Sequence, residues 1–209
     1  RVLLDSCIAV GHFDLVHIQL VRLGELVLAS QRSIPTILDF VDALSVNMQR
    51  RADLDRWPLS AVARREAKLL ASYEQKLLSR ITAGCVSSPI DRKALGSEQK
   101  LTQINNGVDL PRFPWVPPDL RPDVPTILFV GNLGYFPNVD AIRWFHRDIY
   151  PQVCDRIAGV QLVLVGARPH RSLHRIAAID RSVSLVGPVA DVYPYLARAT
   201  ITVAPLRSG

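Results

Sequence analysis

The sequence predicts an α/β protein with two lobes, each built around a parallel β-sheet. Short β-branched runs alternate with longer segments of helical period, which is typical of strand–helix–strand units. This alternation occurs twice in the 209 residues. Between residues 107 and 125 it stops in a proline-rich stretch that cannot form a regular element. We therefore predict one domain over residues 1–107, a linker over 108–125 and a second domain over 126–209.

In the first half, β-branched and aromatic runs predict strands at residues 13–18, 35–40, 81–86 and 101–105. Apolar periodicity predicts a helix over 21–30 and a long helix after Pro58. Ser88 and Asp91 provide the chemistry of a helix start. The long helix is expected to bury one face and to expose the other. Residues expected on its buried face are Leu59, Val62, Glu66, Leu69, Leu70, Tyr73, Leu77 and Leu78, and those on its exposed face are Arg64, Arg65, Lys68 and Lys76.

The second half repeats the pattern. Strands are predicted at residues 126–130, 160–165, 182–186 and 200–204, and helices near 138–154, 172–179 and 191–197. In a doubly wound sheet, ligands bind beyond the carboxyl ends of the strands, where loops lead into helix N-termini. The turns at Gly131, Gly166 and Gly187 are expected at that place. Glycine there allows a diphosphate to approach backbone N–H groups closely.

Bulk composition excludes disorder, because the chain is 48% hydrophobic and 21% charged. The net charge of +6 indicates an anionic partner, which charge alone does not distinguish among nucleic acid, an acidic membrane leaflet and a phosphorylated small molecule. The basic residues are scattered or paired without interleaved aromatics, so we expect no nucleic acid. Three distant cysteines fit a reducing compartment, and no apolar run approaches the ~20 residues of a membrane span, so a cytoplasmic location is expected.

Metal-binding patterns are weak in this sequence. Asp53 and Asp55 form an Asp-x-Asp pair, but it lies in an Arg-rich, helix-like stretch typical of a solvated face. His170 and His174 have the spacing of helical zinc ligands without an acidic or cysteine partner nearby. The segment around Gly131 lacks the lysine of a phosphate-binding Walker loop. We expect neither a metal nor a cofactor.

Eight landmarks occur in order along the chain and together resemble one family. They are Phe13-Asp14-Leu15-Val16-His17; Leu38-Asp39-Phe40-Val41-Asp42-Ala43-Leu44-Ser45; Val86-Ser87-Ser88 with Asp91; Asn106-Gly107-Val108-Asp109; Phe129-Val130-Gly131-Asn132 with Pro137-Asn138-Val139-Asp140; Val165-Gly166; Val186-Gly187-Pro188-Val189 with Asp191; and Ala204-Pro205-Leu206-Arg207-Ser208-Gly209. The sequence resembles retaining glycosyltransferases of the family-4 type, and within them a bacterial subgroup associated with surface polysaccharide.

The resemblance implies two Rossmann-like lobes of the GT-B architecture, both incomplete in a chain truncated at its two ends. Residues 1–107 correspond to the C-terminal part of the acceptor-side domain. Residues 126–209 correspond to the N-terminal part of the domain that binds the nucleotide-sugar donor. The implied reaction transfers a sugar to a hydroxyl group with retention of configuration and without a metal.

The resemblance also assigns site residues. The donor side comprises Gly131, Asn132, Gly166, Gly187, Pro188, Val189, Arg207, Ser208 and Gly209. Arg207 is expected at the solvent-facing end of a strand, where its guanidinium would stabilise the departing nucleoside diphosphate. His17, which is expected to end a strand and is the candidate catalytic residue, lies on the acceptor side with Gln19 and Arg22.

The family pattern departs from this sequence at two positions. Many relatives carry an Arg and a Lys after the first strand of the donor domain, whereas this chain has Asn132 and Asn138. Asn138 is expected to cap the following helix, with Asp140 in the first turn favouring the helix dipole.

The sequence therefore predicts a hexosyltransferase-type enzyme of bacterial polysaccharide or glycolipid synthesis, with the 209-residue chain inactive alone. Its partners would be a nucleotide-sugar donor and a saccharide or lipid-linked acceptor. Peripheral contact with an anionic membrane, at the inner face of the plasma membrane, is left open. Two alternatives remain at this point: a sugar-nucleotide epimerase of the same architecture, and a non-catalytic nucleotide-sugar-binding protein.

Overall fold

The computed structural model describes residues 2–29, 34–96 and 99–208. Contacts divide the chain into two compact units, Arg1–Val108 and Asp109–Gly209. Each unit is described by itself below. The proline-rich segment predicted as a linker clusters with the second unit from Asp109 onward. Arg121 contributes to this, because its guanidinium donates to the carbonyl oxygens of Val116 (2.8 Å) and Thr200 (3.1 Å).

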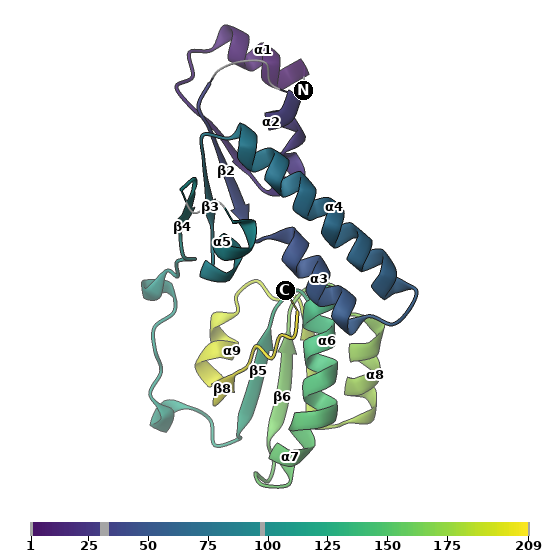
Figure 1. Ribbon diagram of the computed structural model, residues 1–209. Coiled ribbons are helices and arrows are strands. Elements are labelled where there is room, and N and C mark those ends of the chain that lie inside the picture. The colour runs from purple at the N-terminus through teal and green to yellow at the C-terminus, as the bar shows by residue number, and fades with distance from the viewer. Residues whose placement is uncertain (1, 30–33, 97–98, 209) are drawn as a thin grey trace. The chain divides into compact units, whose positions relative to one another are not determined.

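The first unit is built on a parallel sheet in the order β1-β2-β3-β4 (Figure 1). Its strands are β1 (Val16–Gln19), β2 (Thr36–Val41), β3 (Ala83–Val86) and β4 (Leu101–Gln103). Its helices are α1 (Val2–Val10), α2 (Glu25–Ala29), α3 (Leu44–Leu54), α4 (Leu59–Arg80) and α5 (Pro89–Leu95), with a 3-10 turn at Val21–Leu23. The largest fully buried side chains of its core are Leu38, Phe40, Leu77, Leu95 and Leu101.

The buried face of helix α4 differs from the predicted one. Leu59, Val62 and Leu69 are 57%, 56% and 55% exposed, although the sequence pattern predicts their burial. The N-terminal half of the helix instead buries Ser60, Ala63 and Ala67, and the neighbouring helix α3 buries Ala52. These small side chains allow α3 and α4 to pack closely, as ridges in grooves. Period alone identified the helix but not which of its faces packs.

The second unit has a parallel sheet in the order β7-β6-β5-β8. Its strands are β5 (Thr126–Val130), β6 (Gln161–Val165), β7 (Val183–Gly187) and β8 (Ile201–Thr202). Its helices are α6 (Phe136–Trp144), α7 (Tyr150–Cys154), α8 (Arg171–Ile179) and α9 (Tyr193–Arg198), with a π-helical turn at Phe145–Ile149 and 3-10 turns at Leu110–Arg112 and Pro118–Leu120. The strand order reverses at β5, which creates a topological switch point between β5 and β8.

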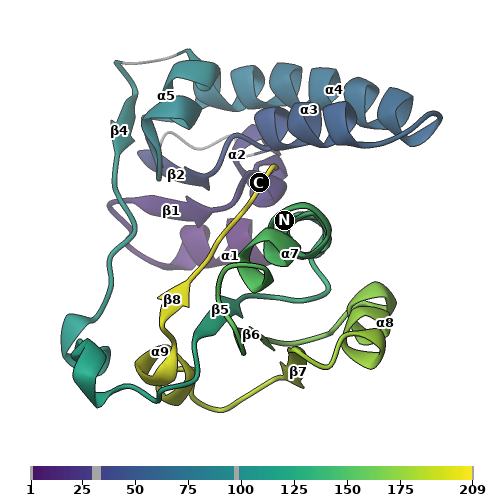
Figure 2. The ribbon, with the colours of Figure 1, turned by 90° about the horizontal axis from the view of Figure 1, so that it is seen from below.

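Strand β5 contributes to a core on each face of the second sheet. Ile127 and Phe129 pack in the cluster that also contains Ile142 of α6 and Leu173 of α8. Leu128, on the opposite face, packs in the cluster that receives side chains of α9. Figure 2 shows α6 and α8 on one side of the strand row and α9 on the other. Burial on both faces explains why these strands are continuous apolar runs rather than alternating ones.

The α/β class with parallel sheets is confirmed, while several element boundaries differ from those predicted. Strand β1 begins at Val16 rather than residue 13, and the helix predicted over 21–30 is a 3-10 turn followed by the short α2. The helix predicted over 138–154 is interrupted by the π-helical turn. Helix α1 was not predicted, and of α3 only the Arg-rich stretch around Asp53 was expected to be helix-like. Among the described helices, none is long and apolar enough to cross a membrane.

Candidate functional site

Three predicted donor residues meet at the carboxyl edge of the second sheet, the edge where its strands end. Gly131 follows β5, Gly166 follows β6 and Gly187 ends β7. The backbone N–H of Gly131 donates to the carbonyl of Val165 at 3.0 Å, and that of Gly166 donates to the carbonyl of Gly187 at 2.8 Å. Because the strands are neighbours in the order β7-β6-β5, the three glycines line one continuous edge.

Gly166 and Gly187 differ in what surrounds them. Gly166 has φ 151°, and a Cβ built there would lie 1.6 Å from the carbonyl oxygen of Gly131, so a side chain cannot fit. Gly187 has φ 84°, and its Cβ would meet nothing within 4 Å. Gly166 is therefore required by close packing of backbone on backbone. Gly187 leaves open space over its backbone, as close approach of a ligand requires.

The two asparagines shape the loop between β5 and α6. Asn138 is not the cap of α6, because the helix begins at Phe136 and its cap position is Tyr135. Pro137 accounts for the earlier start, since proline lacks an N–H and suits the first turn. The Asn138 Nδ2 donates to the carbonyl of Asn132 at 2.9 Å, and the Asn132 Oδ1 accepts from the N–H of Gly134 at 3.1 Å. Their polar atoms thus hold the loop in shape.

Arg207 is held by residues of α6. Its Nε and Nη2 donate to Asp140 Oδ2 and Oδ1 at 2.9 and 2.5 Å, and its Cζ lies 5.5 Å from the ring centroid of Trp144. Asp140 is beyond the first turn of α6, so the expected dipole role is wrong and its partner is Arg207. The Arg207 side chain keeps 34% exposure, and a guanidinium has five N–H donors. Donors therefore remain for a second anion.

Ser208 follows Arg207 and is 4% exposed. Its Oγ is buried and finds no hydrogen-bond partner among the residues that the structure describes. An unpaired buried hydroxyl is uncommon, because it loses its hydrogen bonds to water. Gly209, also predicted on the donor side, lies outside the described residues.

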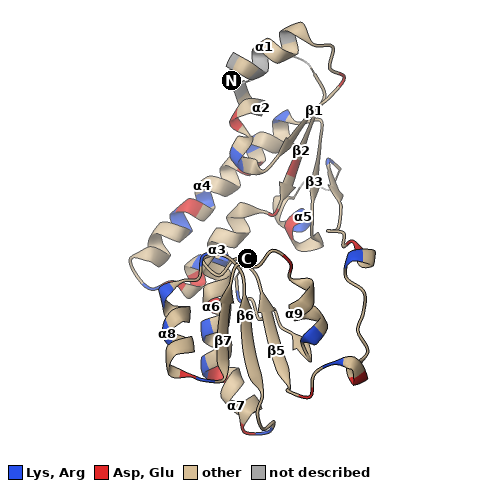
Figure 3. Ribbon diagram, turned by 180° about the vertical axis from the view of Figure 1, so that it is seen from behind, with Lys and Arg blue, Asp and Glu red and all other residues tan. Residues whose placement is uncertain are grey.

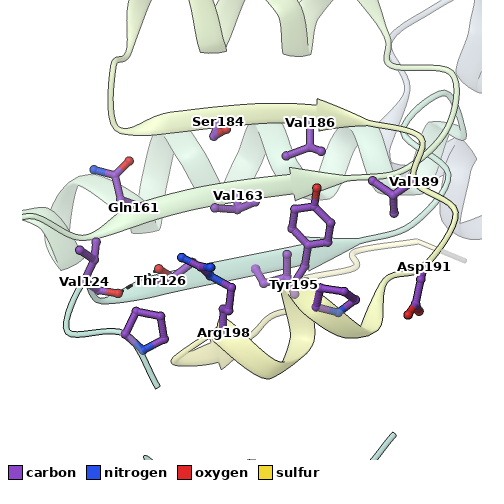
Figure 4. A pocket seen from close by; sticks show the side chains of 13 residues that line it. Val124, Thr126, Gln161, Val163, Ser184, Val186, Val189, Asp191, Tyr195 and Arg198 are labelled. Atoms are coloured by element: carbon purple, nitrogen blue, oxygen red, sulfur yellow. Dashed lines mark hydrogen bonds between the residues drawn. The ribbon is translucent and has the colours of Figure 1, made fainter. Parts of the chain in front are cut away.

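Two cavities adjoin this edge. One of about 290 Å³ lies at the N-terminal ends of α6 and α8, lined by Gly134, Phe136, Val139, Asp140, Arg143 and His170. The other, about 730 Å³, follows the sheet face beside α9 (Figure 4). Side chains of β6, β7 and α9 face this second space, including Val163, Ser184 and Tyr195. Its carboxyl end reaches Val189, which with Pro188 extends the Gly187 turn.

His170, the first histidine of the pair, has a structural role. The His170 side chain accepts a hydrogen bond from the N–H of Ser172 at 3.2 Å and caps α8. Nowhere in residues 2–29, 34–96 and 99–208 do three or more His, Cys, Asp or Glu side chains gather in a group that could hold a metal ion.

The acceptor-side residues lie at an edge strand of the first unit. His17 and Gln19 are exposed on β1, and their spacing of two places them on the same face of the sheet. His17 is the second residue of this four-residue strand, so the prediction that it ends the strand is wrong. Arg22 is exposed in the 3-10 turn that follows. The roles assigned to these three residues stay predictions.

Buried carboxylates organise the carboxyl edge of the first sheet. Glu74 of α4 is 1% exposed, and its two oxygens accept from the N–H and the hydroxyl of Ser45 at 3.2 and 2.5 Å. Asp91 of α5 is 8% exposed and accepts from the N–H of Ala43 at 3.1 Å. Both carboxylates satisfy N–H groups at the start of α3, which would otherwise be unpaired. Sequence reasoning missed Glu74, although an acidic residue at a position with the period of the buried face was a usable signal.

These carboxylates shift the acid–base properties of the first unit. Burial raises the pKa of Glu74, and the hydrogen bonds from Ser45 oppose that rise. Burial also raises the pKa of Asp42, and the nearby charge of Asp91 adds to it. The folded first unit therefore favours protonation of this edge.

Backbone strain occurs at the carboxyl edges of both sheets. Leu20 follows β1 with φ 77°, Val41 ends β2 with φ 62°, and Arg168 lies in the turn after β6 with φ 56°. The N–H of Val41 is held by Asp39 Oδ1 at 2.9 Å. Left-handed backbone is unfavourable for residues with a Cβ, above all for a β-branched one, and such strain gathers at functional sites.

Solved structures share this fold at low sequence identity. Sucrose-phosphate synthase from Thermosynechococcus elongatus is 17% identical with a TM-score of 0.67, and the match covers 98% of this chain and 53% of that one. HepE from Anabaena, solved in complex with UDP and glucose, is 13% identical with a TM-score of 0.62, covering 96% of this chain and 54% of that one. OtsA in its apo form is 12% identical with a TM-score of 0.60, covering 100% and 56%. The chain thus spans about half the length of these structures.

The paired parallel sheets and these likenesses define the fold class as GT-B. A protein-family model described as "Glycosyl transferases group 1" matches residues 124–209. That match spans most of the second unit, including the glycine edge and Arg207. The comparison with curated proteins gave no match.

Proposed function

We propose that the protein is a glycosyltransferase that moves a sugar from a nucleotide-sugar donor to a hydroxyl acceptor, with the second unit on the donor side. The observation that carries this proposal is that the family match and the glycine edge lie in the same unit. The family match over residues 124–209 falls on the unit whose three glycines meet at the carboxyl edge of its sheet. Anabaena HepE, which shares the fold, was solved with UDP and glucose.

The chemistry of the edge supports a diphosphate ligand. Gly187 leaves open space over its backbone, and the N-terminus of α6 presents N–H groups, which bind phosphate oxygens well. The Arg207 guanidinium, partly exposed, keeps N–H donors that Asp140 does not use. In this proposal Arg207 stabilises charge that develops on the departing nucleoside diphosphate.

The finer proposals follow from the family resemblance. The transferred group is a hexose, its configuration is retained, no metal takes part, and the acceptor is a saccharide or lipid-linked molecule of bacterial polysaccharide or glycolipid synthesis. The first unit, with His17, Gln19 and Arg22, lies on the acceptor side. Because the chain spans about half the length of its structural neighbours, we assign turnover to the longer protein and expect the 209 residues alone to bind nucleotide without turnover.

A pair of matched glycine variants tests the donor site. Gly187→Ala adds a methyl group over the proposed phosphate contact, and we expect UDP to bind at least about tenfold more weakly, the loss of one charge-assisted hydrogen bond. Gly159→Ala is the control, because Gly159 also has positive φ (72°) and open space but lies between α7 and β6, at the opposite end of the strands. Isothermal titration of both variants with UDP makes the measurement.

Equal UDP affinities for the wild type and Gly187→Ala would contradict the site. Absence of UDP binding by the wild type would contradict the donor role of the second unit. Thermal melts of the two variants separate strain from binding, since both substitutions carry the same cost of left-handed backbone.

A further inference from the structure

The exposed side of α4 combines apolar and basic side chains, and nothing in the proposed donor site uses it. Trp57, just before the helix, is 82% exposed, and Leu59, Val62 and Leu69 are more than half exposed. Isolated exposed apolar residues are ordinary, but a contiguous set is not. We call these four residues, with Arg64, Arg65, Lys68 and Lys76, the α4 surface.

Helical geometry places four residues of the α4 surface in one row along the helix. Val62, Arg65 and Leu69 are three and seven residues apart, so they lie in one row along the axis. Lys76 continues the same row, Lys68 lies about a quarter turn to one side of it and Leu59 about a quarter turn to the other, and Arg64 lies beyond Lys68. The buried side, with Ala63 and Ala67, is opposite this row. Figure 3 shows basic residues along the length of α4.

The charges of the α4 surface lack acidic partners within the described chain. None of Arg64, Arg65 and Lys68 forms an ion pair with a residue in the described ranges. Glu66, exposed four residues after Val62 and three before Leu69, is the one acidic side chain among the four cations of the α4 surface, and Glu74 is buried. The surface therefore keeps a positive field with an apolar stripe beside it.

We propose that the α4 surface docks on the surface of an anionic membrane, lying in the plane of the interface. Interfacial helices have basic side chains that meet anionic headgroups, together with Trp and Leu that enter the headgroup–acyl boundary. Arg and Lys stems also pack along apolar surface while their charges stay in water. Burial of Trp57, Leu59, Val62 and Leu69 in that boundary accounts for their exposure in the isolated chain.

Other occupants fit less well. A second copy of the chain would bring Arg64, Arg65 and Lys68 toward like charges, which repel across a contact of low dielectric. A nucleic acid would use the cations but leave Leu59, Val62 and Leu69 against a phosphate backbone. The membrane uses both kinds of side chain. The inference holds whether or not the second unit binds a nucleotide.

Vesicle binding tests the proposal with two matched pairs of variants. The probes are phosphatidylcholine vesicles with and without about 30% phosphatidylglycerol. Arg65→Gln/Lys68→Gln/Lys76→Gln removes three cations of the α4 surface, and Arg171→Gln/Arg175→Gln/Arg181→Gln removes three exposed arginines of the second unit. Trp57→Ser removes the exposed ring, and Trp115→Ser, at a residue that is 73% exposed, is its control.

We expect the wild type to bind the anionic vesicles and not the neutral ones. The triple variant on α4 should bind about 100-fold more weakly, since each basic residue near an anionic surface contributes about fivefold. Its control should stay within about threefold of the wild type, which is below the contribution of a single well-placed charge. Trp57→Ser should weaken binding and abolish the blue shift of tryptophan fluorescence, and Trp115→Ser should do neither.

Several results would overturn the proposal. They are equal binding to neutral and anionic vesicles, no binding to either, and retention of full binding by the α4 triple variant while its circular dichroism melt matches the wild type. A concentration-dependent dimer in light scattering that Trp57→Ser disrupts, without vesicle binding, would assign the surface to a second copy instead.

Discussion

The two sheets carry the same kind of edge, built with opposite chemistry. In the first unit, buried carboxylates from flanking helices fix the loop after β2, as Glu74 and Asp91 accept hydrogen bonds at the start of α3. In the second unit, backbone meets backbone directly, with Gly166 packed against the carbonyl of Gly131. In the first edge, the buried polar side chains form hydrogen bonds to the start of helix α3. The second leaves open space over the backbone of Gly187, which suits a ligand that approaches the main chain closely.

A substitution at Gly166 should have the largest effect on the edge of the second sheet. A methyl group there would lie 1.6 Å from the Gly131 oxygen, and φ 151° is unfavourable for any residue with a Cβ. We expect Gly166→Ala to destabilise the second unit by about 3 kcal/mol or more, because strain and overpacking add. Urea unfolding gives the magnitude, and hydrogen exchange of β6 against β2 shows whether the loss stays within the second unit. A cost below about 1 kcal/mol would mean that the edge relaxes and is not held by backbone packing.

Arg207 sharpens the comparison, because it is the charged element of the second edge. A charge-assisted contact to phosphate contributes roughly 1.5–3 kcal/mol, so Arg207→Ala should weaken UDP binding by about tenfold to a hundredfold. Asp140→Asn should weaken it less, since the guanidinium remains but loses the carboxylate that orients it. Titration calorimetry with UDP measures both.

A thermal melt decides how the Arg207 result is interpreted. Arg207 also pairs with Asp140 and packs over Trp144, so its removal has a structural cost that the sequence did not suggest. If UDP affinity of Arg207→Ala stays within about twofold of the wild type, or the loss follows a fall in Tm, the arginine acts in packing alone.

The sequence predicted what periodicity and turn chemistry encode. Strand β5 was placed at its observed bounds, and Ser88 caps α5 as expected, its Oγ accepting from the N–H of Asp91. The sequence also placed Gly131, Gly166 and Gly187 after strands, and parallel topology then brings them to one edge.

What the sequence missed depends on tertiary partners. The burial of Ala63 in place of Val62 follows from which side of α4 meets α3, and period alone does not encode that choice. The pairing of Arg207 with Asp140 joins residues 67 positions apart, and the contact of Glu74 with Ser45 spans 29. No local pattern indicates either contact. The roles assigned to His17, Gln19 and Arg22 remain predictions.

The smallest expected effect is a difference in the pH dependence of the two units. In the first unit, burial raises the pKa of Glu74 above its ordinary value of 4.5. In the second, burial of Asp180 is outweighed by hydrogen bonds from Ser182 and His146, so its pKa falls below 3.8. A raised carboxyl pKa contributes stability that is fully present below pH 4.5 and is lost as pH rises through the raised value. A lowered one contributes stability above pH 3.8 that is lost as pH falls.

Acidification from pH 7 toward pH 4.5 should therefore stabilise the first unit and leave the Asp180 contribution to the second unchanged. Hydrogen exchange of amides in β2 and β6, corrected for intrinsic rates, measures the two units in one sample. Glu74→Gln keeps an oxygen for the N–H of Ser45 and cannot ionise, so it should flatten the response of β2 alone. If β2 still responds to pH in Glu74→Gln, the response is assigned to Asp42 instead, because burial also raises the pKa of Asp42. If β2 instead becomes less stable as the pH is lowered from 7 to 4.5, the first edge is not held by a buried carboxyl group with a raised pKa.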